Sequence, residues 1–178
     1  MSNESQPESL LTREYVQGIL NIETGCLDKG ISCVPKVLVK LHSGKSGILT
    51  IPEMGSDSNR KRLIFYALGR KLRAEHGGIR EAVFIVDSWI IDASTPGSTK
   101  FAPSQHPARE EAIVIVGRNE DKSCSLIAIQ PFDRDKKEKP IWQEPIISIS
   151  GEGGYSYEGI LDDFFTGAAQ VTVPEMKA

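Results

Sequence analysis

The sequence predicts an α+β domain of two layers, in which a mostly antiparallel or mixed sheet carries one long helix and helices near both ends. Two observations predict this class. Short β-rich runs follow one another with only polar turns between them, which is typical of hairpins. A single long amphipathic pattern, at residues 57–76, interrupts these runs early in the chain. This order favours helices on one face of the sheet over the alternating strands and helices of a doubly wound fold.

Length and charge narrow the possibilities further. The chain has 178 residues, enough for one domain with one substantial core. We expect a disordered tail at residues 1–9, a single domain at residues 10–170 and a flexible tail at residues 171–178. The net charge of -3 argues against a generally nucleic-acid-binding surface. No run approaches the roughly 18 to 20 apolar residues that cross a bilayer, and the start is polar and acidic, so we expect a cytoplasmic protein without membrane contact.

The first elements are a short helix and a hairpin. Apolar residues recur at helical spacing over residues 10–20, with Ser9 or Thr12 as the N-cap and Gly25 as the stop. Two β-rich runs follow, at residues 34–41 and 47–51. The polar turn between them contains Gly44, which favours a hairpin.

The clearest helix spans residues 57–76. Ser56 or Asp57 can cap its N-terminus, and Gly77 follows its end. At about 100° per residue, one broad arc is apolar and faces inward; its residues are Leu63, Ile64, Phe65, Ala67, Leu68 and Leu72. The opposite arc is basic and carries one aromatic ring; its residues are Arg62, Tyr66, Arg70 and Arg73.

The second half of the chain predicts more strands and a final helix. Strands are expected at residues 82–91, 112–117, 123–130 and 146–150. The second and third of these form a hairpin across a short polar turn, and the charged residues 132–139 form an exposed loop or a hairpin tip. After a flexible turn at residues 151–154, a helix at residues 157–169 turns its apolar side inward, with Ile160, Leu161, Phe164 and Phe165.

Unusual chemistry is concentrated at residues 83–117. Asp87 interrupts an apolar strand, and burying an unpaired carboxylate costs on the order of several kcal/mol. Three interpretations stay open: a solvent-facing position, a structural ion pair, or a catalytic or binding acid. Arg109 or Lys100 from the following loop would supply the partner in the second case.

A catalytic site would use Asp87 and Glu111 with His106, which lies in the same polar loop. A metal site needs at least three convergent ligands, so we expect no metal here. We also expect no cofactor, because the Gly44–Lys45–Ser46 turn lacks the earlier glycine of a phosphate-binding loop. The three cysteines, Cys26, Cys33 and Cys124, have no metal-binding spacing and are expected to be plain reduced thiols.

The same region carries a resemblance. Asp87-Ser88-Trp89 ends one strand, and the loop Pro103-Ser104-Gln105-His106-Pro107-Ala108-Arg109-Glu110-Glu111 starts the next. This pattern, over about residues 83–133, resembles an uncharacterised family of bacterial and phage proteins with an acid-x-Trp strand end and a Pro-Ser-x-x-Pro-x-Arg-x-Glu loop. The resemblance carries no activity. It implies a loop of defined shape in which Arg109 and Glu111 pair. Separately, we expect Trp89, Ser104 and Arg109 to be binding residues.

Three functions follow as hypotheses. The first is a small cytoplasmic accessory or interaction protein without catalytic activity, anchored to a protein partner by Trp89 and Trp142. The second is a hydrolase-like enzyme that uses Asp87, His106 and Glu111. The third is a nucleic-acid-associated regulator that uses the basic helix face at residues 62–73.

Overall fold

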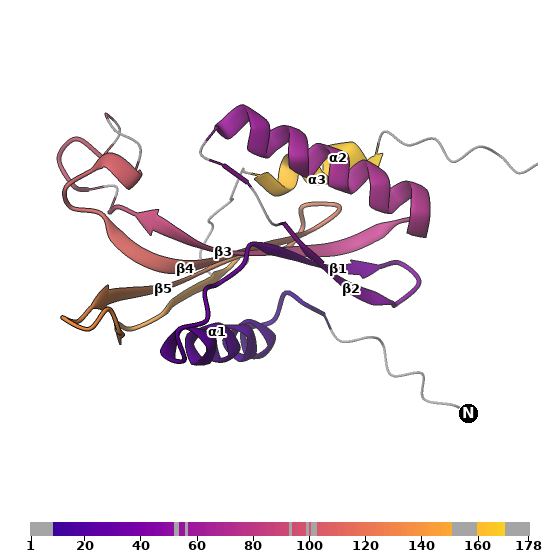
Figure 1. Ribbon diagram of the computed structural model, residues 1–178. Coiled ribbons are helices and arrows are strands. Elements are labelled where there is room, and N and C mark those ends of the chain that lie inside the picture. The colour runs from indigo at the N-terminus through magenta and orange to yellow at the C-terminus, as the bar shows by residue number, and fades with distance from the viewer. Residues whose placement is uncertain are drawn as a thin grey trace, which may run out of the picture.

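The structure is a computed structural model that describes residues 9–51, 54–55, 57–92, 94–98, 100, 103–150 and 160–169. Within these residues it has three helices and a seven-stranded antiparallel sheet, which confirms the predicted α+β class (Figure 1). The elements in chain order are α1 (Arg13–Asp28), β1 (Lys36–Leu41), β2 (Ser46–Thr50), α2 (Ser58–His76), β3 (Ile79–Ile90), η1 (Pro103–Gln105), β4 (Glu110–Asn119), β5 (Ser125–Arg134), β6 (Pro140–Trp142), β7 (Ile146–Ile149) and α3 (Ile160–Ala169).

The strands lie in the order β2-β1-β3-β4-β5-β6, and β7 also pairs with β5. The predicted hairpins are present as β1–β2 and β4–β5, and the charged segment at residues 132–139 forms the tip of the β5–β6 hairpin. One connection is longer: α2 carries the chain from β2 across to β3, on the other side of β1. Among the described residues, no helix is both long enough and apolar enough to cross a bilayer.

The helices cover both faces of the sheet, which differs from the predicted arrangement of two layers with helices on one face. Figure 1 shows α2 and α3 above the sheet and α1 below it. Successive strand residues point to opposite faces. Val37 and Phe84 therefore pack under α2 and α3, while Leu38 and Val83 pack on α1. Because the central strands are apolar on both sides, each side needs its own cover.

Helix α1 continues through Gly25 to Asp28, eight residues beyond the predicted end near Leu20. The side chain of Thr12 caps it by accepting a hydrogen bond from the Tyr15 N–H. The end is set by Gly30, which has φ of +76°. The Gly30 and Ile31 N–H groups donate to the Leu27 and Cys26 carbonyls, the double closure of a Schellman motif. Gly30, not Gly25, is the stop signal.

Helix α2 starts and ends where the sequence predicts. Asp57 is its N-cap, and its carboxylate accepts from the Arg60 N–H at 2.7 Å. Phe65 and Leu72 are buried, as expected of the apolar arc, whereas Leu63 and Ala67 are exposed. The other proposed cap, residue 56, lies outside the described residues.

Helices α2 and α3 touch through their backbones. A Cβ at Gly69 would lie 1.9 Å from the Phe164 carbonyl oxygen, and a Cβ at Gly167 would lie 2.0 Å from the Tyr66 carbonyl oxygen. No side chain fits at either position. The crossing buries Leu161, Phe164 and Phe165 of α3, as predicted; residues 157–159 and the Ile160 side chain lie outside the described part.

Ion pairs hold α3 to its neighbours on both sides. The Arg62 guanidinium of α2 donates two hydrogen bonds to Asp163, at 3.0 and 3.1 Å. On the sheet side, Asp162 accepts from Arg118 of β4 and also pairs with Lys122. These contacts fix the helix pair over one end of the sheet.

A buried polar cluster lies between α1 and β1. Glu23 is 4% exposed, and its carboxylate pairs with the Lys36 ammonium at 2.5 Å. The neighbouring Cys33 thiol is buried beside Glu23, and burial, together with the negative charge of Glu23, raises the pKa of Cys33 to about 12.

We predict that Gly69→Ala lowers the free energy of unfolding by roughly 2 to 4 kcal/mol, because the added methyl forces the two helix backbones apart. Urea denaturation measures the change. The control is Gly18→Ala in α1, where an added Cβ meets nothing within 4 Å. That variant should gain about 0.5 to 1 kcal/mol from its better helix propensity. Equal effects of the two substitutions would contradict the close crossing.

We predict that Cys33 resists alkylation in the folded protein. At pH 8 its thiol stays protonated, so iodoacetamide should modify Cys33 at least about a hundredfold more slowly than the half-buried Cys26. Peptide mass spectrometry against time measures both rates. In urea the two rates should converge, and comparable rates in the native protein would show that Cys33 is not buried as described.

Candidate functional site

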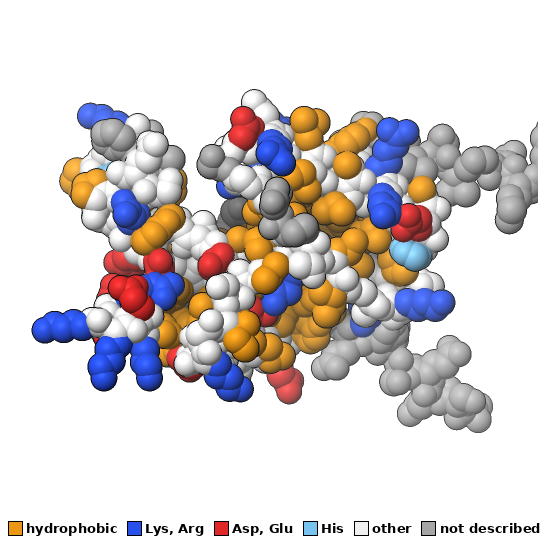
Figure 2. All heavy atoms as spheres, in the orientation of Figure 1, with side chains coloured by type: hydrophobic (Ala, Val, Ile, Leu, Met, Phe, Trp, Pro, Cys, Tyr) orange, Lys and Arg blue, Asp and Glu red, His pale blue; other side chains and the backbone are white. Residues whose placement is uncertain are grey.

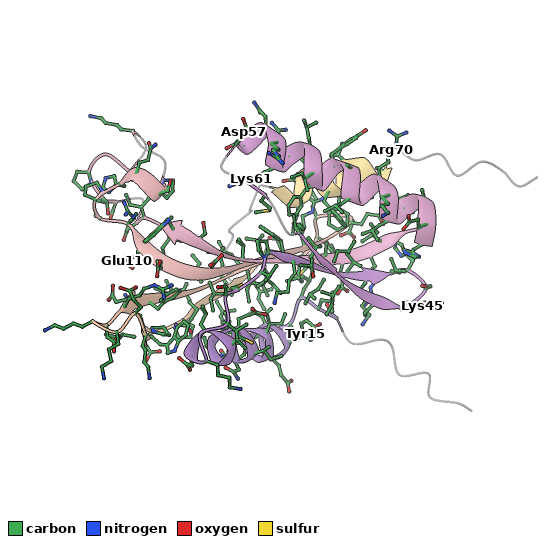
Figure 3. The ribbon with its side chains drawn as sticks, viewed as in Figure 1. Tyr15, Lys45, Asp57, Lys61, Arg70 and Glu110 are labelled. Atoms are coloured by element: carbon green, nitrogen blue, oxygen red, sulfur yellow. The ribbon has the colours of Figure 1, made fainter. Side chains whose placement is uncertain are left out.

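A groove lies where β3, β4 and β5 extend past α1, between the β5–β6 hairpin and a loop lobe made of residues 91–92, 94–98, 100 and 103–109 (Figure 1). It consists of two adjoining pockets of about 180 and 330 Å³ that share four residues, Trp89, Glu111, Phe132 and Arg134. We call it the Trp89 groove. Its other lining residues are Asp87, Ser88, Arg109, Glu110, Ala112, Asp133 and Glu138. Figure 2 shows acidic side chains gathered in this region, and Figure 3 labels Glu110 at the base of the lobe.

Strand register brings the groove residues together. Trp89 is paired with Glu111, Glu111 with Phe132, and Phe132 with Trp142. Directly opposed residues in an antiparallel sheet point to the same face, with Cβ atoms about 5 Å apart. The four side chains therefore form one row across four strands, and Asp87 lies one step along β3 from this row, on the same face.

Both arginines of the groove lie over aromatic rings. The Arg109 guanidinium is 4.5 Å from the centre of the Trp89 ring, and the Arg134 guanidinium is 5.3 Å from the centre of the Phe132 ring. Arg134 Nε also donates to Glu111 Oε2 at 2.5 Å. The predicted pairing of Arg109 with Glu111 is therefore replaced by an Arg134–Glu111 pair. Arg134 reaches Glu111 from the neighbouring strand β5, whereas the Arg109 guanidinium lies over the Trp89 ring.

Asp87 faces the groove and is exposed. Within the described residues its carboxylate has no ion pair, either with Arg109 or with Lys100. Groove residues shield one side of the carboxylate, and this desolvation raises the pKa of Asp87. Glu111 raises that pKa further, while Arg134 acts in the opposite direction. Asp87 is therefore solvent-facing and, among the described residues, not held in a structural ion pair, while its role as a catalytic or binding acid stays a prediction.

His106 is a structural residue of the loop lobe. It is 5% exposed; Nδ1 accepts from the Ala108 N–H at 3.1 Å, and Nε2 lies 3.3 Å from the Pro96 carbonyl, to which it donates. Both ring nitrogens therefore contact backbone groups of the loop lobe. His106 lines neither pocket of the groove, so the structure does not assemble it with Asp87 and Glu111.

Two other predicted binding residues lie elsewhere. Ser104 is exposed on η1, outside the groove lining. Trp142 is half-buried: its ring is 5.1 Å from Phe132, and its Nε1 donates to Asp28 at 3.0 Å. Trp142 thus links β6 to α1 and packs against the Phe132 ring. Of the two tryptophans, Trp89 is the one that lines the groove.

The residues of the predicted basic face of α2 lie in different environments. Arg62 is held by Asp163, the Tyr66 backbone lies against Gly167, and the Arg73 Nε is buried without a partner among the described residues. Arg70 projects from the helix and is exposed (Figure 3). The four predicted side chains do not form one open basic surface.

Sequence reasoning did not assign seven of the lining residues to a site: three of them, Ser88, Glu110 and Ala112, flank predicted ones, and the other four are Phe132, Asp133, Arg134 and Glu138. These four fall in a segment whose mixed charges indicated only an exposed tip. An apolar Phe132 directly before a charged run was the available signal that this strand continues into the tip.

Within the described residues, no group of three or more His, Cys, Asp or Glu side chains is placed to hold a metal ion. The resemblance of residues 83–133 to an uncharacterised bacterial and phage family stays a prediction. Comparison of the chain with family models, curated proteins and solved structures finds no match.

Proposed function

We propose that this protein is a non-catalytic interaction protein whose Trp89 groove binds a basic segment of a partner polypeptide. One observation carries the proposal: an exposed tryptophan lies in a groove whose lining residues include five acidic residues and two arginines. The acidic residues are Asp87, Glu110, Glu111, Asp133 and Glu138, and the arginines are Arg109 and Arg134. Asp87 and Glu111 share the face of Trp89, whereas Glu110 and Asp133 occupy alternate strand positions at the rim.

The charge of the groove favours a cationic ligand. Arg134 already pairs with Glu111, which leaves the other four carboxylates without an ion pair among the described residues. A groove with such an excess of one charge attracts the opposite charge and raises its local concentration. Lys136, Lys137 and Lys139 belong to the nearby hairpin tip, but none of them lines either pocket.

Trp89 supplies the apolar contact that a basic segment needs. Its side chain is 37% exposed, and the Arg109 guanidinium over its ring shows that the ring accepts a cation in this setting. Tryptophan is enriched among the residues that dominate binding energy at protein interfaces. Arg and Lys from a partner would combine ion pairs to the carboxylates with stacking on the exposed part of the Trp89 ring.

The hydrolase-like alternative finds less support. A general base must reach the proton that it abstracts, and both His106 ring nitrogens are engaged by backbone groups of the loop lobe. Glu111 is held by Arg134. The nucleic-acid alternative is weakened by the ion pair between Arg62 and Asp163.

We predict that an octapeptide of alternating Arg and Ala binds the groove and changes Trp89 fluorescence, whereas its Glu counterpart does not bind. Trp89→Ala should weaken the affinity by about tenfold or more, as expected of a central interface aromatic. Glu110→Gln should weaken it more modestly, and added salt should weaken it for all variants. Isothermal titration calorimetry measures these affinities.

The matched control is Glu14→Gln, which removes one exposed carboxylate from α1, outside the groove lining. It should leave the affinity unchanged. Equal binding of both peptides, or full binding by Trp89→Ala, would refute the assignment of the groove.

We predict opposite effects of Asp87→Asn on stability and on binding. The pKa of Asp87 is higher in the folded protein than in the unfolded chain, so ionisation of Asp87 opposes folding above this pKa. Because the carboxylate is exposed and solvent screens its charge, the variant should gain only a small amount of unfolding free energy at pH 7, well below about 1 kcal/mol. The gain should vanish below the ordinary Asp pKa of about 3.9, where both states are protonated.

The same variant should bind the basic peptide more weakly. Thermal denaturation at pH 7 and pH 3, together with calorimetric titration, measures both effects. A loss of stability at pH 7 would show instead that Asp87 has a structural partner.

A further inference from the structure

We infer that the protein has a second binding site, on the opposite face of the sheet, for a carboxylate that carries a linear hydrocarbon chain. The site is a hollow between the first turn of α2 and strands β3 and β4, with a volume of about 470 Å³. We call it the Lys61 hollow. Its floor and walls are Pro35, Met54, Gly55, Lys61, Phe84, Val86, Asp87, Ser88, Ile90, Val114 and Val116.

The floor is apolar because of strand alternation. Asp87 and Trp89 point into the Trp89 groove, so their neighbours Val86 and Ile90 point to the other face. Of the lining residues on β3 and β4, Phe84 and Val116 are buried at the inner end, whereas Val86, Ile90 and Val114 are only half-buried. The hollow therefore deepens towards the core and opens towards the end of β3.

The hollow exists because the helix pair stops short of the strand ends. The glycine crossing and the Asp162 and Asp163 ion pairs fix α2 and α3 over one part of the sheet. Strand β3 has twelve residues and continues past this cover. A volume of this size lies within the range of small-molecule sites.

Lys61 gives the hollow its charge. Its side chain is half-buried against the apolar wall and has no ion pair or hydrogen bond to any described residue. The nearby Asp57 carboxylate is used as the helix cap (Figure 3). Among the described residues this partly buried ammonium has no counter-ion, and a ligand carboxylate would supply one.

The remaining polar groups do not favour a polar ligand body. The Asp87 side chain faces the Trp89 groove, and the Ser88 hydroxyl donates to the Trp89 carbonyl at 3.4 Å. A ligand with a hydrocarbon chain on the apolar floor and a carboxylate at Lys61 would complement both the floor and the ammonium. Fatty acids are the simplest ligands of this chemistry.

Decanoate, used below its micelle concentration, is the probe, and decanol is its uncharged match. Isothermal titration calorimetry should show decanoate binding, with decanol about tenfold weaker, because a charge-assisted contact contributes roughly this factor. Lys61→Ala should lower the affinity for decanoate by about tenfold and leave the affinity for decanol unchanged. Lys61→Arg should keep the preference for decanoate over decanol. Lys71→Ala, an exposed lysine of the same helix, should change neither.

A floor variant tests the location. Ile90→Gln, at the open end of the hollow, should lower the affinity for both decanoate and decanol. The melting temperature of this variant reports whether the fold is kept. Trp89→Ala should bind decanoate as the parent protein does, so this site and the groove are tested separately. Absence of decanoate binding, equal affinity for decanol, or an unchanged decanoate affinity in Lys61→Ala would each overturn the inference.

Discussion

The architecture depends on the contact between the backbones of α2 and α3 at Gly69 and Gly167. The helices approach so closely that a single methyl group at either glycine would collide with a carbonyl oxygen of the other helix. This approach lets Phe164 and Phe165 reach the sheet, where Arg118 lies 4.7 Å from the centre of the Phe165 ring. It also keeps the helix pair narrow, so that α2 and α3 cover one part of the face, and within the described part of the chain no other helix covers the rest of it. The Lys61 hollow is a direct result of this narrow cover.

Strands β3 and β4 serve two surfaces at once. Residues that alternate along β3 belong to different environments: Asp87 and Trp89 lie in a charged groove, whereas Val86 and Ile90 lie in an apolar hollow. A shift of register by one residue would exchange these environments and bury the carboxylate under α2. The register is held by ten residue pairs between β3 and β4, from Glu81 with Asn119 to Ile90 with Glu110. The pairing of strands therefore decides which β3 and β4 side chains face each surface, while Arg109, Glu138 and Lys61 reach these surfaces from outside the strands.

Local signals explain what could be predicted from the sequence. The Asp57 cap and Gly77 act within a few residues of the ends of α2, so both ends are correct. The apolar spacing of α3 likewise identified Leu161, Phe164 and Phe165 as core residues. The end of α1 was wrong because Gly25 and Gly30 are similar signals locally, and a contact from outside the helix, Lys36 to Glu23, favours the longer helix. The Arg134–Glu111 pair depends on the β4–β5 register, which no local pattern reveals.

The order of elements along the chain has a consequence for how the molecule folds. The contact of Arg62 with Asp163 joins residues separated by 101 positions. The strands β3, β4 and β5, with the β3–β4 and β4–β5 pairings, lie between them in the sequence. Contacts this distant in sequence form slowly, because a long loop must close before they stabilise anything. Until α3 docks, Phe65, Phe84 and Val116 lack the cover that it supplies. The half-folded sheet is thus the species that is most exposed to aggregation, and the speed of α3 docking determines how long it persists.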